Sequence, residues 1–150
     1  GVIAGTCTVS DGVISDNAAK VLQGSAIEGG RGGGIFVGYD ETSKNYGKLI
    51  MEGGVISNNT AEVEGGGLYA FNNRTTTSEQ IAAQGEQTIT ISGGDIIGNT
   101  SINGGGVYTK YNIFNFIDGN ISSNVSAGRG GGLSALDAVV DIDGGNITSN

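Results

Sequence analysis

The chain has 150 residues, the size of one domain, and its 37% hydrophobic content is enough for a packed interior. Its 30 glycines do not recur at every third position, which excludes a collagen helix. Seven basic residues against fifteen acidic ones give a net charge of −8, and the basic residues form no run, so we predict no nucleic-acid partner. The single cysteine, Cys7, excludes an internal disulfide and is expected to be a small buried apolar side chain.

The first unit of the chain combines alternating apolar residues with an Ile-x-x-Asn segment. Cys7 and Val9 alternate with polar residues, the period of a half-buried strand, and Ile14 follows in "VISDN", which ends at Asn17. The segment returns four times, at spacings of 42, 40, 25 and 26 residues. Superposing the units gives three apolar columns and one asparagine column. They are Cys7, Leu49, Ile89, Phe114 and Val140; Val9, Met51, Ile91, Phe116 and Ile142; Ile14, Ile56, Ile96, Ile121 and Ile147; and Asn17, Asn59, Asn99, Asn124 and Asn150.

A glycine triplet followed by one aliphatic residue recurs in step with these segments. The common unit is 25 to 26 residues long, and the longer spacings require insertions at about 18–30, 38–48 and 72–86. The last two are polar, lack a clean period and are expected to be loops. The triplets begin at Gly32, Gly65, Gly104 and Gly130, and the aliphatic residues are Ile35, Leu68, Val107 and Leu133.

Short strands at a fixed spacing, each continuing in the same direction as the last, must stack in parallel. We therefore predict an all-β, right-handed, single-stranded parallel β-helix (β-solenoid) with about 25 residues per coil. One domain spans 1–150, with about four complete coils and part of a fifth. Because the chain begins and ends within a repeat, we interpret it as a fragment whose partners include flanking coils of the same chain. No apolar run is long enough to span a membrane.

Two repeated residue types are predicted to have structural roles. One glycine falls at the same place in every unit, where a tight bend requires positive φ or close backbone approach. The asparagine column predicts a ladder in which each amide donates to the amide or backbone of the next coil, although asparagine also suits left-handed bends. The bend glycines are Gly12, Gly54, Gly94, Gly119 and Gly145.

The two motifs together resemble the GGA(I/L/V) and FxxN repeats of chlamydial polymorphic outer membrane proteins. They are also similar to adhesin-like right-handed β-helix proteins of bacterial and archaeal surfaces. "GGGIF", "GGGLY", "GGGVY" and "GGGLS" match the first motif with Gly in place of Ala, and "ISDN", "ISNN", "IIGN", "ISSN" and "ITSN" match the second with Ile in place of Phe. The resemblance implies a secreted, cell-surface or outer-membrane passenger that presents loops for glycan or host-surface binding.

Candidate ligand-binding residues lie around the glycine triplets. Phe36, Tyr69 and Tyr108 each follow a post-triplet aliphatic residue, and they form either a platform for sugar rings or a rank of rings stacked on one another. Arg31 and Arg129 each precede a triplet, in a column with Glu64 and Asn103. Neighbouring coils would bring Arg31 beside Glu64, in an ion pair worth less than about 1 kcal/mol.

The chemistry available for catalysis is limited, and no catalytic residue is assigned. The alternative to an adhesin is a polysaccharide lyase or glycoside hydrolase of the pectin-lyase-like fold, which would need a Lys or Arg base or convergent carboxylates. Histidine is absent. Asp141 and Asp143 share one strand face and are weak candidates for calcium, with a solvated acidic face as the alternative; no other metal or cofactor is predicted.

Overall fold

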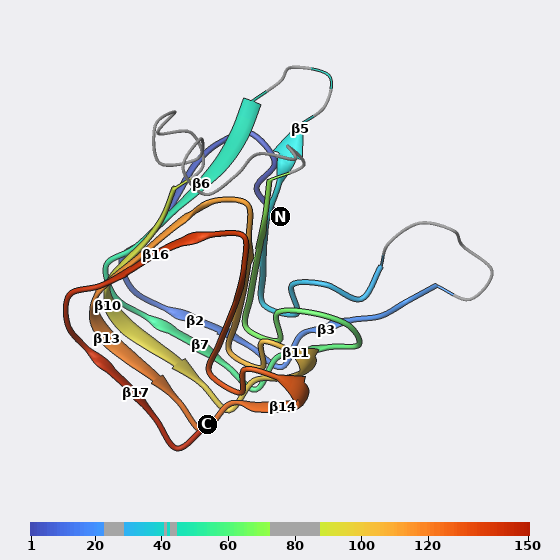
Figure 1. Ribbon diagram of the computed structural model, residues 1–150, viewed down its shortest axis with the longest axis vertical. Coiled ribbons are helices and arrows are strands. Elements are labelled where there is room, and N and C mark those ends of the chain that lie inside the picture. Colours follow the sequence, from blue (N-terminus) through green and yellow to red (C-terminus); the bar gives the residue numbers. More distant parts are fainter. Residues whose placement is uncertain (23–28, 41, 43–44, 73–87) are drawn as a thin grey trace.

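The structure, a computed structural model, describes residues 1–22, 29–40, 42, 45–72 and 88–150, and it is an all-β chain coiled into a parallel β-helix (Figure 1). The coils have a triangular outline in Figure 1, and strands of successive coils pair in parallel in three sheets. The predicted parallel stacking is therefore confirmed.

The largest sheet has nine strands and forms two sides of the triangle. One side runs in the order β1-β6-β10-β13-β16, and the other contains β2, β7 and β17 with the second halves of β10 and β13, which continue around the corner. The ninth strand, β5 Tyr39–Asp40, pairs with β6 alone. The other eight are β1 Gly5–Val9, β2 Val13–Ser15, β6 Asn45–Met51, β7 Val55–Ser57, β10 Thr88–Ile97, β13 Ile113–Ser122, β16 Val139–Ile142 and β17 Asn146–Thr148.

Two four-stranded sheets complete the coil. The shorter strands β3 Ala18–Ala19, β8 Thr60–Ala61, β11 Thr100–Asn103 and β14 Val125–Arg129 follow the Ile-x-x-Asn segments. The third side of the triangle follows the glycine triplets and consists of β4 Ile35–Val37, β9 Leu68–Phe71, β12 Val107–Lys110 and β15 Leu133–Leu136.

The pairing register reproduces the columns read from the sequence. Cys7 pairs with Leu49, Leu49 with Ile89, Ile89 with Phe114 and Phe114 with Val140. The inward members of the middle coils are fully buried and form one continuous core, against which half-buried Cys7 also packs. In the last coil Ile142 is 52% exposed, because no described coil covers it. Hydrophobic burial thus comes from stacking each apolar residue on its equivalent in the next coil.

The glycines serve two physical purposes. Gly94 and its four equivalents all have positive φ, between 73° and 113°, as the bend prediction required. The first glycine of each triplet is also left-handed, for example Gly65 with φ 66°. The second needs space: a Cβ on Gly66 would lie 2.4 Å from the Gly105 carbonyl oxygen. The triplets therefore mark a corner where adjacent coils touch backbone to backbone.

The second insertion is more ordered than expected. Instead of a loop throughout 38–48, the structure forms a short antiparallel pair between β5 Tyr39–Asp40 and the start of β6. Tyr39 opposes Tyr46, and their ring centroids are 5.0 Å apart. This cross-strand ring contact, which a search for the coil period overlooks, explains the pairing. Residues 23–28 of the first insertion and residues 73–86 of the third lie outside the described residues.

Candidate binding face

The asparagine column forms a continuous ladder along the coil axis. The Asn99 side-chain oxygen accepts hydrogen bonds from the Asn59 backbone N–H (2.9 Å) and the Asn59 amide (3.0 Å). The Asn99 amide donates to Asn124 at 3.0 Å and to the Ile56 carbonyl at 2.9 Å. The pattern repeats at every coil from Asn17 to Asn150. In the middle coils these side chains are fully buried, and they form hydrogen bonds to the neighbouring coils. The ladder amides therefore hold the coils together.

The aromatic column lies in register on the outer side of the sheet β4-β9-β12-β15. Tyr69 pairs with Phe36 and with Tyr108, and its ring centroid lies 5.4 Å and 5.7 Å from theirs in stacked geometry. Tyr69 is 3% exposed and Tyr108 is 6% exposed. Both faces of the Tyr69 ring are therefore occupied by neighbouring rings, and the stack stiffens the sheet.

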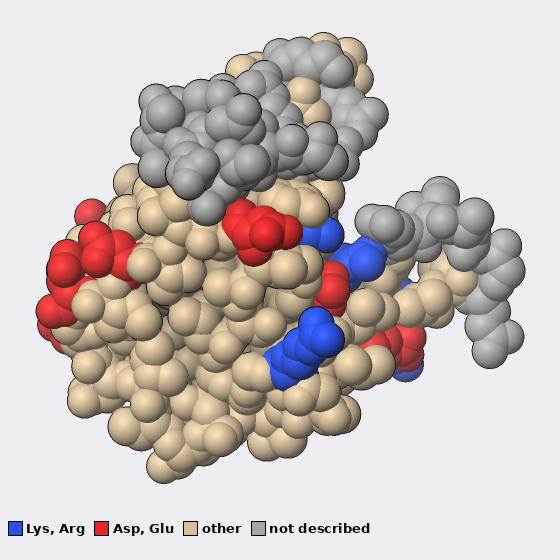
Figure 2. All heavy atoms as spheres, viewed as in Figure 1, with Lys and Arg blue, Asp and Glu red and all other residues tan. Residues whose placement is uncertain are grey.

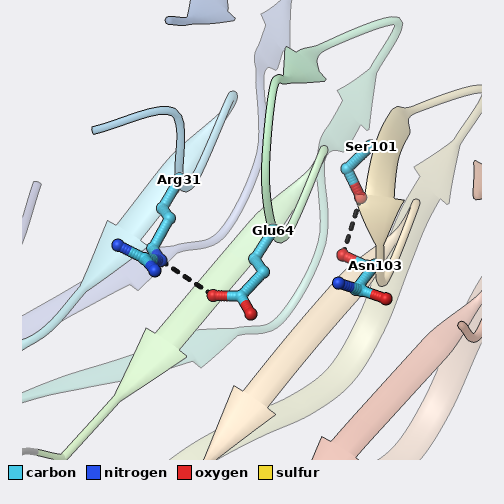
Figure 3. A network of polar contacts seen from close by, with 4 residues as sticks. All are labelled: Arg31, Glu64, Ser101 and Asn103. Atoms are coloured by element: carbon cyan, nitrogen blue, oxygen red, sulfur yellow. Dashed lines mark hydrogen bonds and ion pairs between the residues drawn. The ribbon is translucent and has the colours of Figure 1, made fainter. Parts of the chain in front are cut away.

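Arg31 and Glu64 meet at the start of this sheet, as the column predicted (Figure 3). The Arg31 Nε lies 2.7 Å from a Glu64 carboxylate oxygen, and the Arg31 guanidinium also lies 5.8 Å from the Tyr69 ring centroid. Asn103 follows Glu64 in the next coil, and its backbone carbonyl accepts a hydrogen bond from the Ser101 hydroxyl. Arg31 thus joins the ion pair to the ring stack.

Arg129 occupies the same column two coils beyond Glu64. Its backbone N–H donates to the Asn103 side-chain oxygen at 3.2 Å, and Asn103 pairs with Arg129 in the register of β11 and β14. Its charge acts on the Tyr108 hydroxyl, opposing the effect of Glu64. Arg31 and Arg129 therefore lie close enough to the ring stack for their charges to act on Tyr108, although Arg129 belongs to the sheet of β11 and β14. These two arginines, the ring stack, the other outward residues of β9 and β12, and Tyr111 are here called the binding face.

Tyr108 has an unusual ionisation. Burial, the negative charge of Glu64 and a hydrogen bond to Glu64 raise the pKa of Tyr108 from 10.0 to about 12, against a smaller lowering effect from Arg31 and Arg129. The neutral phenol is favoured by folding, so its contribution to stability is complete below the unfolded pKa and is lost as pH rises through the folded one.

We therefore expect the free energy of unfolding to fall between about pH 10 and pH 12 through Tyr108. In Glu64→Gln the Tyr108 pKa should move down toward its ordinary value, because the charge contribution is gone while burial remains. Phenolate absorbance, compared with a Tyr108→Phe variant to identify the transition, measures this shift. An unchanged Tyr108 titration in Glu64→Gln would show that the carboxylate does not act on the phenol.

Three further residues on the binding face escaped the sequence analysis. Phe71 in β9 and Lys110 in β12 are register partners, and Tyr111 follows Lys110. The Phe71 ring centroid lies 6.2 Å from that of Tyr69 and 6.3 Å from that of Tyr111. Their columns differ from coil to coil, so the search for repeated residues did not single them out. The sequence feature that could have identified them is a second aromatic residue shortly after Tyr69 and Tyr108, namely Phe71 and Tyr111.

Acidic residues gather elsewhere. Figure 2 shows Asp and Glu side chains at the left margin of the view, where β10 and β13 turn the corner in Figure 1, while the Lys and Arg side chains lie apart from it. Asp141 and Asp143 are exposed, as a solvated face requires. Within the described ranges, no three His, Cys, Asp or Glu side chains come together in an arrangement that could hold a metal ion.

The comparisons with known proteins give no relative. No family model matches the chain, and neither the curated proteins nor the solved structures contain a match. In the part of the chain that the structure describes, no helix is long and apolar enough to cross a membrane.

Proposed function

We propose that this chain is a non-catalytic, adhesin-like β-helix segment, exposed at a cell surface or secreted, that presents the binding face and its insertions to glycans or a host surface. One observation carries the proposal. The second insertion follows β4 and the third follows β9, and β4 and β9 are paired neighbours in the sheet that bears the stacked rings. Two of the three insertions thus leave the same edge of one sheet from adjacent strands.

The contrast with the rest of the coil supports this assignment. The repeated polar residues hold the coils together, as the buried ladder amide of Asn99 does. Ser57 and Ser122 are half-buried and flank the exposed Ile97 in an outward column of the nine-stranded sheet. Rigid scaffolds with variable loops at one edge are a common design for binding proteins.

Removing residues 74–87 should leave the coil folded and abolish ligand binding. Two residues, Tyr111 and Asn112, connect Lys110 to Ile113 in the next coil, whose register partners are Phe71 and Thr88. The deletion leaves Asn72 and Asn73 as the equivalent connection, and asparagine accepts the turn conformation. Binding to a broad glycan panel and to host-cell surfaces, with urea unfolding as the check on folding, measures the effect.

The matched control is Ile97→Ser on a different side of the coil, which copies Ser57 and Ser122 and should bind as the parent does. Undiminished binding by the folded deletion variant would remove the insertion from the proposed site. Absence of binding to every glycan and surface would contradict the proposed function. Release of unsaturated uronate products from an acidic polysaccharide would instead favour the lyase alternative.

A further inference from the structure

The downstream end of the binding face differs from its buried centre. Phe71, Lys110 and Tyr111 are all half-buried, whereas Tyr69 and Tyr108 are buried. The Lys110 ammonium lies 4.8 Å from the Tyr111 ring centroid and 5.7 Å from that of Phe71. These three residues, here called the Lys110 cluster, thus offer aromatic surface and a positive charge that are still accessible to solvent.

Among the described residues, no acid neutralises the charge of Lys110. No described carboxylate forms an ion pair with it, although the chain as a whole carries a net charge of −8. Its register partners are Phe71 and Leu136, both apolar, so the sheet itself does not require a cation there. A lysine between two rings keeps its hydrogen-bond donors available while the rings stabilise its charge.

Tyr111 is unusual because of its backbone. It has φ 55°, in the left-handed region, where the other described non-glycine residues with positive φ are Asp, Asn or Ser. A bulky side chain is disfavoured in that conformation. The equivalent residue of the next coil, Asp137, has φ 47° and satisfies the turn with a short polar side chain. The turn therefore does not explain the tyrosine, and strain of this kind points to function.

We propose that the Lys110 cluster binds a negatively charged sugar unit, carboxylated or sulfated, as the anchor point of the glycan in the proposed function, on which this inference rests. The C–H face of the sugar ring packs on Tyr111 and Phe71, and the acidic group accepts hydrogen bonds from the Lys110 ammonium. The stack of Phe36, Tyr69 and Tyr108, in which the two tyrosines are buried, supports this cluster through the Tyr69–Phe71 contact and does not touch the ligand.

Titration calorimetry of the whole chain tests the site with three probes: an oligogalacturonate for carboxylate, a heparin-derived hexasaccharide for sulfate together with carboxylate, and maltohexaose as the neutral control. We expect one or both acidic probes to bind, more weakly at high salt, and maltohexaose to bind at least tenfold more weakly. Comparing the two acidic probes identifies the acidic group.

Two substitutions locate the binding. Tyr111→Asn should weaken binding of the acidic probe by roughly tenfold or more without lowering the melting temperature, because asparagine suits the turn. Lys110→Leu, which copies the Leu136 column neighbour, should weaken it similarly and remove its salt dependence, while Lys110→Arg should retain it. Tyr111 lies in a left-handed turn, whereas Lys110 lies in a strand. If one variant fails to fold, the other variant still tests the site.

The outcomes separate this inference from the proposed function. If glycans bind but both Tyr111→Asn and Lys110→Leu bind as the parent does, the Lys110 cluster is not the site, and the proposed function stands. If only neutral glycans bind, the assigned ligand class is wrong. If no glycan binds, the inference fails together with glycan binding as the function.

Discussion

Replacing Asn99 with alanine is expected to lower the free energy of unfolding by on the order of 4 kcal/mol, since several buried hydrogen-bond partners at about 1–3 kcal/mol each are left unpaired. The Asn99 side chain is fully buried. Its oxygen accepts from the backbone and amide of Asn59, and its amide donates to Ile56 and Asn124. Urea unfolding followed by circular dichroism measures the loss.

Asn17→Ala provides the matched control. Asn17 has the same place in the repeat but lies exposed in the first described coil, where water replaces its lost contacts, so we expect a loss below about 1 kcal/mol. Equal losses of unfolding free energy for the two variants would mean that the stability contributed by a ladder asparagine does not depend on its burial. Asn99→Asp should also destabilise the coil, because a carboxylate cannot donate to the Ile56 carbonyl.

The Gly66→Ala substitution is expected to prevent folding, or to cost well over about 4 kcal/mol, a magnitude typical of steric conflict that cannot relax. The new Cβ would lie 2.4 Å from the Gly105 oxygen and 2.6 Å from the Thr100 oxygen, both backbone atoms. The Gly66 N–H donates to the Gly104 carbonyl, so the coils cannot move apart without losing their ladder. Solubility, circular dichroism and urea unfolding report the outcome.

Gly12→Ala separates steric conflict from backbone strain. Gly12 has φ 96°, and a Cβ there would meet nothing within 4 Å, so its substitution adds only the left-handed strain, about 1–2 kcal/mol. A comparable loss for Gly66→Ala would show that the coils yield at the triplet and that close backbone contact is not what selects glycine there.

The sequence predicted which residues of the candidate site share a column, but it did not predict how deeply each one is buried. The column Arg31, Glu64, Asn103 and Arg129 is a true register column, and the expected Arg31–Glu64 pair forms. The aromatic column also lies in register, yet alternation placed its rings on the outside without showing that Tyr69 and Tyr108 would be buried there. Exposure depends on everything packed around a ring, which strand parity does not contain.

The repeated sequence alone specifies the coil. Its columns pair as aligned, because each residue stacks on its own equivalent and a slip of one position would turn the whole apolar set outward. Only the tertiary structure revealed the Lys110 cluster, in which Phe71 and Lys110 come from different coils and Tyr111 adopts a left-handed turn. The β5–β6 pair was likewise visible only in three dimensions. Repetition encodes contacts between like residues, whereas contacts between unlike residues depend on how unique segments fold onto the coil.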